Sequence, residues 1–268
     1  MPHTTRRRSK PTLKHQHLTT SDGWTHVFRG TFAQKHAPRP PRIPVLSPTE
    51  IPSGLTLAKV QETYTKCTRQ WRESEWCAEL VRILRTDVLP GVIGEGEEIE
   101  GKGVDSCVVL GLGSLSGGDG REHSWWQLAA LQTILEELRS QHPIARILFQ
   151  DPRFNRLDEE FLASLSFTVV KNPEAFSFID AATFLYIPHG ELEVTGKALG
   201  GEDPALYIGN DLDMWIESPT VPMGEKSTVM PWREKSVSVA LPQAEGSSWG
   251  NNTRIYWKRP RVDGAANE

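Results

Sequence analysis

The stretch VVLGLGSLS changes from an apolar run into a glycine-punctuated turn whose backbone amides could bind a phosphate. Gly111 and Gly113 fit the first two positions of a dinucleotide-binding fingerprint, whereas Ser116 stands where a third glycine is needed. The acid that could bind a ribose is Asp151, 38 residues after Gly113 instead of about 20. This weakens an NAD site and leaves two alternatives. Either Gly111, Gly113 and Ser114 bind a ligand, or the turn only connects a strand to a helix.

Three more apolar runs end in polar side chains, which a parallel sheet would bring to one edge. Asp151 precedes Pro152, which favours an extended backbone, and its carboxylate could accept from a ribose hydroxyl, help to hold a metal or cap the next helix. His189 directly follows Pro188 and could act as a general base, a metal ligand, a partner of a phosphate or a structural residue. Asn210 ends the last of these runs and offers polar side contacts to a ligand.

Several common kinds of active site lack their signature in this sequence. No second histidine stands at metal-ligand spacing from His189, so we predict no metal site. The turn has no G-K-[ST], which disfavours ATP or GTP hydrolysis, and the chain has no G-x-S-x-G nucleophile elbow. The cysteines form no CxxC pair, so we expect a reducing compartment and thiols inside helices and strands: Cys67, Cys77 and Cys107.

Charge is distributed unevenly along the chain. Residues 1–42 carry nine lysines and arginines and one acid, whereas the rest holds 21 basic and 33 acidic residues. Together with the six prolines of 36–54, this predicts a basic, largely disordered arm over 1–54, in which SDGWTHVF (21–28) could form a short strand or docking segment. The run RRRSK could be a nuclear address, a polyanion-binding patch or a solvated tail. The acidic body argues against nucleic acid as the main ligand.

After the arm, the hydrophobic pattern alternates between helical and strand-like segments. Helical spacing over 56–90 is expected to end at Pro90. A further helix over 124–140 is predicted to begin with a capping box of Ser124 and Gln127. The predicted strands are 106–113, 145–150, 167–170, 183–188 and 205–210, with a helix at 157–165 and late, edge-type antiparallel strands at 236–241 and 253–259.

This alternation predicts the α/β class, as a Rossmann-like three-layer sandwich with a mostly parallel sheet and an N-terminal helical segment. We place the domain at 55–260 and a short tail at 261–268. No apolar stretch approaches the roughly 18–20 residues of a membrane span, and the N-terminus lacks the apolar region of a signal peptide. We therefore expect a soluble protein of the cytoplasm or the nucleus.

Five motifs occur in the order and spacing of one family: VVLGLGSLS, QLAALQTIL, FQDPRFNRLDEEFL, YIPHGELEV and YIGNDLDMW. Over roughly 57–220 the chain resembles the Sensitivity to Red Light Reduced family, which carries an SRR-like domain, and SDGWTHV resembles a tryptophan motif that precedes that domain. The family's motif positions correspond here to Gly111, Gly113, Ser114, Asp151, Pro152, Pro188, His189, Gly209 and Asn210. Many members have a cysteine after the histidine, where this chain has Gly190.

The resemblance implies a regulatory protein, linked to light or circadian signalling or to the control of tetrapyrrole (haem) metabolism. Its cleft would take a small anionic or nucleotide-like ligand, and no particular cofactor follows from the residues. One alternative is a nucleotide- or S-adenosylmethionine-dependent transferase with His189 as general base. Another is a protein-interaction module that uses the basic arm and surface tryptophans, for which the candidates are Trp125, Trp126, Trp215 and Trp232.

Overall fold

The computed structural model describes residues 15–19 and 25–29, and residues 46–258 except 94–102, 118–120, 142, 243–249 and 251. The chain forms two compact units, 1–45 and 46–268. In the first unit, β1 (His15–Thr19) pairs antiparallel with β2 (Thr25–Arg29). The tryptophan motif therefore reaches β2 with residues 25–28, while its residues 21–24 lie outside the described residues, as do RRRSK and the tail 261–268.

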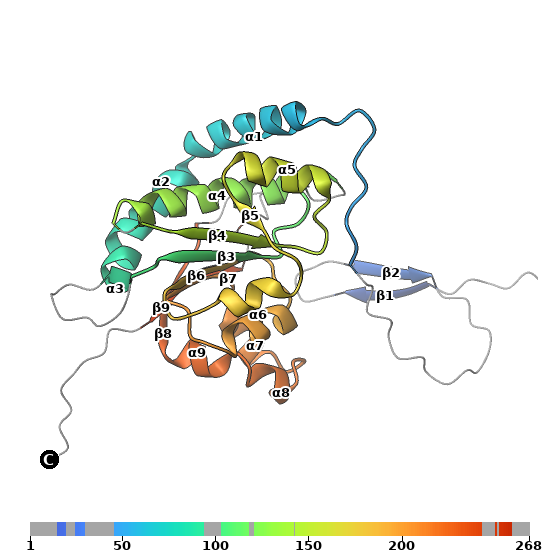
Figure 1. Ribbon diagram of the computed structural model, residues 1–268. Coiled ribbons are helices and arrows are strands. Elements are labelled where there is room, and N and C mark those ends of the chain that lie inside the picture. The colour runs from blue at the N-terminus through green and yellow to red at the C-terminus, as the bar shows by residue number, and fades with distance from the viewer. Residues whose placement is uncertain are drawn as a thin grey trace, which may run out of the picture. The chain divides into compact units, whose positions relative to one another are not determined.

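A seven-stranded sheet forms the centre of the second unit (Figure 1). Its spatial order is β5 (Thr168–Val169), β4 (Arg146–Gln150), β3 (Ser106–Leu110), β6 (Thr183–Ile187), β7 (Leu206–Asn210), β9 (Thr253–Lys258) and β8 (Ser236–Ala240). The five strands from β5 to β7 run parallel, whereas β9 runs antiparallel to both of its neighbours. The predicted mostly parallel sheet is confirmed, and the antiparallel pairs lie at one side of it.

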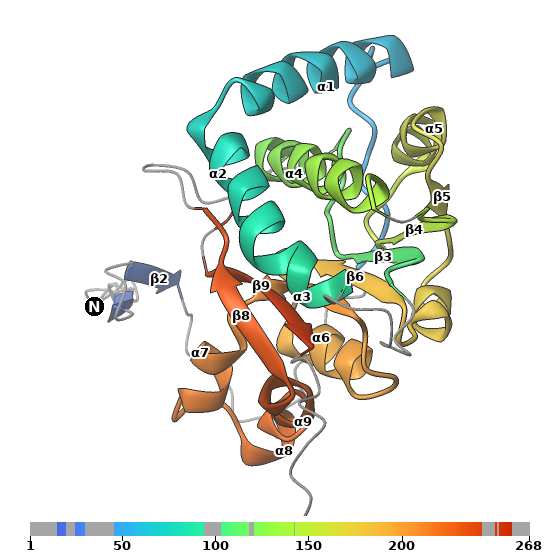
Figure 2. The ribbon, with the colours of Figure 1, turned by 90° about the vertical axis from the view of Figure 1, so that its left-hand side faces the viewer.

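Helices cover both faces of the sheet, because strands that are apolar on both sides must be buried on both sides. One face carries α1 (Leu57–Arg72), α2 (Glu75–Ile83), α3 (Leu89–Ile93), α4 (Arg121–Arg139) and α5 (Arg156–Ser164). The other carries the 3-10 helix η2 (Glu174–Phe178) and the helices α6 (Leu192–Leu199), α7 (Leu212–Glu217), α8 (Met223–Lys226) and α9 (Met230–Glu234). Figures 1 and 2 show these two helical layers with the sheet between them, which confirms the three-layer prediction.

The core consists of two hydrophobic clusters, one on each face of the sheet. Strand β3 shows the division, since Cys107 and Val109 pack into the cluster under α1–α5. Val108 and Leu110 pack into the opposite cluster, as the alternation of side chains along a strand requires. All five residues of β3 are buried, so the glycine turn leaves the sheet from its interior.

The helical segment predicted over 56–90 is interrupted twice. Ser74 separates α1 from α2 and caps α2, since its hydroxyl accepts from the Cys77 amide. A π-helical turn, η1 (Leu84–Val88), then leads into α3. The prediction that Pro90 ends the helix is wrong: α3 follows η1 without a break, and Pro90 is its second residue. The wider turn of η1 accommodates a residue that has no N–H to donate.

The predicted start of α4 is also wrong. The helix begins at Arg121, three residues before Ser124. The Ser124 hydroxyl does not cap the helix but donates to the Leu112 carbonyl at 2.8 Å, so it ties α4 to the glycine turn. Gln127 is buried inside the same helix, and its carbonyl accepts from the Tyr186 hydroxyl. A tertiary partner has replaced the local capping box at this position.

Candidate functional site

The carboxyl ends of β3, β4, β6 and β7 meet at one edge, because these strands are parallel neighbours in the sheet. The predicted site residues follow these four ends. Hydrogen bonds divide them into two groups: the glycine turn with Asp151, and the loop of His189 with Asn210.

The glycine turn needs its glycines for backbone reasons. Gly111 and Gly113 have φ of +68° and +82°, a region that residues with a side chain rarely adopt. The Gly111 amide donates to the Gln150 carbonyl at 3.2 Å, and the Gly113 amide donates to Asp151 Oδ2 at 2.7 Å. The turn is thus joined to the end of β4 by two hydrogen bonds.

Asp151 is shared between the turn and its own loop. Its other oxygen, Oδ1, accepts from the Arg153 amide at 2.7 Å. Burial raises the pKa of the Asp151 carboxyl, although these two amides and the Arg153 guanidinium act in the opposite direction. A carboxylate has about four acceptor positions, and these two amides occupy two of those of Asp151. It does not cap α5, because Asn155 does.

Asp158, in the first turn of α5, is the residue that the sequence analysis missed. Its side chain is fully buried, at 0% exposure. Oδ1 accepts from the amides of Leu115 at 3.0 Å and Ser116 at 2.7 Å. Oδ2 accepts from the Ser114 hydroxyl at 2.7 Å and the Asn155 amide at 3.0 Å. A carboxylate has about four acceptor positions, and these four donors fill them. The Asp158 carboxylate is therefore buried with its hydrogen bonds satisfied.

Four backbone amides of the turn therefore have acceptors within the protein. Two carboxylates take the amides of Gly113, Leu115 and Ser116, and the Gly117 amide donates to Ser114 Oγ at 2.9 Å. Convergent backbone amides are what a phosphate needs. A phosphate at this turn would have to displace Asp158. A sequence signal for Asp158 did exist, since Asn-x-x-Asp before an apolar segment is a capping-box pattern, and the structure has that box.

The second group lies at the ends of β6 and β7. His189 is exposed and has φ of +67°, and Gly190 follows it as a buried residue. A Cβ on Gly190 would collide with Ile187 Cγ2, so a side chain does not fit at this position without a shift. Asn210 Nδ2 donates to the Gly190 carbonyl at 2.6 Å and so holds the His189 loop against the end of β7.

Beyond Asn210, charged side chains pair with one another. Arg233 makes two hydrogen bonds of 2.8 Å to Asp213, which lowers the pKa of the Asp213 carboxyl. Asp211 caps α7 by accepting from the Asp213 amide at 3.0 Å, and Arg254 Nη1 lies 3.7 Å from Asp211 Oδ2. These contacts stabilise the end of β7.

The remaining predicted features are structural in character. The three cysteines are buried in α1, α2 and β3, and burial raises the pKa of Cys67 to about 11. Trp125 and Trp232 are buried, at 6% and 1% exposure, so these two cannot belong to a surface for partners. The part of the chain that the structure describes holds no group of three or more histidine, cysteine or acidic residues that could bind a metal. None of its helices combines the length and apolar character needed to cross a bilayer.

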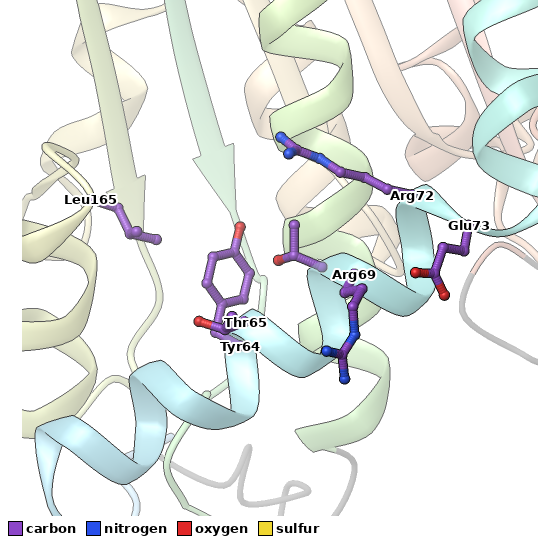
Figure 3. A pocket seen from close by; sticks show the side chains of 7 residues that line it. Tyr64, Thr65, Arg69, Arg72, Glu73 and Leu165 are labelled. Atoms are coloured by element: carbon purple, nitrogen blue, oxygen red, sulfur yellow. The ribbon is translucent and has the colours of Figure 1, made fainter.

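A pocket of about 500 Å³ lies along α1, away from the predicted residues (Figure 3). Its lining comprises Tyr64, Thr65, Thr68, Arg69, Arg72, Glu73 and Leu165. In Figure 3 the Arg72 side chain extends toward the neighbouring helix, where it pairs with Glu136 of α4 at 2.7 Å. None of the sequence-predicted site residues lines this pocket.

Comparison with known proteins gives a family and a structural likeness. No curated protein matches the chain. Among solved structures, the crystal structure of the SAH-bound Podospora anserina methyltransferase PaMTH1 is similar at 8% identity and a TM-score of 0.32, over 75% of this chain and 97% of that one. The model of the SRR1 domain matches residues 84–257, which is more than half of the chain. The chain therefore belongs to the SRR1 domain family.

Proposed function

We propose that this SRR1-domain protein is regulatory and binds a small nucleoside-like ligand at the carboxyl edge of its sheet. The resemblance to the Sensitivity to Red Light Reduced family supports a role in light or circadian signalling, or in the control of tetrapyrrole metabolism. We place this role in the cytoplasm or the nucleus. Family membership supports the regulatory part, and the geometry of the strand ends supports the ligand.

The observation that carries the ligand proposal is the state of Asp151. It is a partly buried carboxylate at the end of β4, and its two amide donors use only two of the about four acceptor positions of a carboxylate. The hydroxyls of a ribose fit such an acceptor. The neighbouring amides are taken by carboxylates, which favours a nucleoside over a nucleotide whose phosphate lies on the turn.

His189 and Asn210 have different parts in this proposal. The His189 ring is exposed at the end of β6, the strand next to β3, and can donate or accept at the rim of the site. Asn210 donates one amide hydrogen to the Gly190 carbonyl and so orients the His189 loop. Its side-chain carbonyl oxygen can accept from a ligand.

Calorimetry with adenosine, AMP, NAD and S-adenosylmethionine tests the proposal. We expect adenosine to bind at least as well as AMP, and Asp151→Asn to weaken adenosine about 10- to 100-fold, because a hydrogen bond to a charged group contributes about 1.5–3 kcal/mol. The matched control is Asp105→Asn, an exposed aspartate just before β3, at the other end of that strand. The proposal fails if none of the four compounds binds, or if both variants bind adenosine as the wild type does.

A transferase is the second candidate, and the strand order favours it. Numbered from β3, the order is 3-2-1-4-5-7-6 with the seventh strand antiparallel, which is typical of S-adenosylmethionine-dependent methyltransferases. A fold does not establish an activity. Release of S-adenosylhomocysteine in the presence of a cell extract, lost in a folded His189→Ala variant, would support a transferase with His189 as base. Equal release by the variant would exclude that role of His189.

A further inference from the structure

The segment 46–51 precedes α1 and lies outside both the domain predicted from sequence and the SRR1 match, yet it is seated on the glycine turn. The Thr49 amide donates to the Arg153 carbonyl at 3.0 Å. A Cβ added to Gly117 would lie 2.5 Å from Thr49 Oγ1 and 2.7 Å from the Glu50 carbonyl oxygen. The segment therefore touches the turn at a position where a side chain has no room.

The Thr49 hydroxyl enters a ready set of polar partners. It donates to Ser114 Oγ at 2.8 Å and accepts from Asn155 Nδ2 at 3.0 Å. The Arg153 carbonyl, at 3.3 Å from Thr49 Oγ1, is a second acceptor for the same proton. We call these three groups, Ser114 Oγ, Asn155 Nδ2 and the Arg153 carbonyl, the hydroxyl niche.

The hydroxyl niche connects Thr49 with the buried carboxylate of the turn. Ser114 Oγ accepts from Thr49 and from the Gly117 amide, and it donates its own proton to Asp158 Oδ2 at 2.7 Å. The Ser114 hydroxyl thus makes its full set of three hydrogen bonds, one as donor and two as acceptor, only while Thr49 is in place. If Thr49 moves away, one acceptor position of Ser114 Oγ and one N–H of Asn155 lose their partner, and a hydroxyl of another molecule could replace it.

The other residues of the segment 46–51 contribute little to its attachment to the domain. Leu46 and Ile51 are 52% and 38% exposed, and Ser47, Pro48 and Glu50 are exposed as well. Little apolar surface is buried by these residues, so the attachment depends mainly on the polar contacts of Thr49. A segment held in this way can detach without disturbing either hydrophobic core.

We propose that residues 46–51 form an autoinhibitory strap, whose Thr49 hydroxyl fills the hydroxyl niche and is exchanged for a ribose-type hydroxyl of a ligand when the strap detaches. The niche thereby becomes a binding site between the glycine turn and the loop after β4, which also carries Asp151. The inference deepens the proposed function but can be tested apart from it, because detachment of the strap is measurable without any ligand.

Hydrogen exchange of the full chain, followed by mass spectrometry, tests the strap. Thr49→Val keeps the shape and removes the hydroxyl, so we expect the amides of 115–117 and of Thr49's own segment to exchange at least tenfold faster. Thr49→Ser restores the hydroxyl and should return exchange to near the wild-type rate. The control is Thr63→Val on α1, where an exposed threonine bonds only to the Lys59 carbonyl of its own helix. Exchange within twofold of wild type in Thr49→Val overturns the strap.

Binding of two nucleosides then tests the niche. Adenosine carries the 2′- and 3′-hydroxyls of its ribose, whereas 2′,3′-dideoxyadenosine lacks these two and keeps only the 5′-hydroxyl. We expect Thr49→Val to bind adenosine at least fivefold more tightly than the wild type and dideoxyadenosine no better. If exchange rises and adenosine binding stays unchanged, the strap stands and the ribose-binding niche is overturned. If adenosine binds neither protein while exchange rises, the failure lies with the proposed ligand class and the niche's ribose assignment, not with the strap.

Discussion

Asp158→Asn removes the charge on which the glycine turn depends while keeping the shape of the side chain. The amide oxygen can keep the two backbone donors of Leu115 and Ser116. The amide nitrogen then faces the Asn155 N–H and the Ser114 hydroxyl, which both donate to Oδ2 in the wild type. Two hydrogen bonds to a charged acceptor are lost, at about 1.5–3 kcal/mol each, and the helix N-terminus loses a favourable negative charge, worth about 0.3–1 kcal/mol.

We expect the free energy of unfolding to fall by about 4 kcal/mol, from a total on the order of 5–15 kcal/mol. For a domain of this size the midpoint of thermal unfolding should fall by about 8–16 °C. Urea unfolding followed by far-ultraviolet circular dichroism and tryptophan fluorescence measures the change. The control is Glu159→Gln, which removes the same charge from the next, exposed residue of α5 and should stay within about 0.5 kcal/mol of wild type. A loss below about 1 kcal/mol in Asp158→Asn would refute the carboxylate-filled turn.

Three further predictions concern packing, thiol reactivity and pH. Gly190→Ala should destabilise the fold by about 1–3 kcal/mol in urea, because its Cβ collides with Ile187, whereas Gly224→Ala has open space and should not destabilise it; equal stability of the two variants contradicts this. No cysteine should react with a chromogenic disulfide reagent at pH 8 in the native state and all should react in urea, since burial raises the pKa of each thiol: Cys67, Cys77 and Cys107. Burial raises the pKa of Asp151 above 3.8, so the folded state binds its proton more tightly than the unfolded state. Ionising Asp151 therefore lowers the free energy of unfolding as pH rises from about 3.8 through the raised pKa, and Asp151→Asn should lack that decline. Parallel pH profiles of the two proteins would contradict this.

The sheet and its covering helices could be predicted because apolar runs of about five residues, each ending at a glycine, proline or polar residue, need burial on both faces. Helix starts were less predictable. Serine is a common helix-capping residue, but the Ser124 hydroxyl donates to the Leu112 carbonyl, 12 residues away in the sequence. Proline commonly ends a helix, but the π-helical turn before Pro90 allows α3 to include a residue without an N–H.

The residue types at the candidate site also followed from the sequence. Asp151, His189 and Asn210 stand at strand ends, and parallel strands place their ends at one edge regardless of the side chains that follow. Their separate tasks did not follow, since an aspartate that accepts from Gly113 and an asparagine that holds Gly190 look the same in sequence as ligand contacts.

The sequence by itself determined the fold class, the edge of the sheet at which the candidate site lies and the side chains at that edge. These features follow from hydrophobic periodicity and turn chemistry, which act over a few residues. Only the tertiary structure decided that the glycine turn is filled by Asp158 and closed by Thr49, which lie 44 and 65 residues from Ser114. A carboxylate is buried without loss only where several donors converge on it. Convergence of the strap, the turn and the start of α5 depends on the packing of distant segments, which no local pattern encodes.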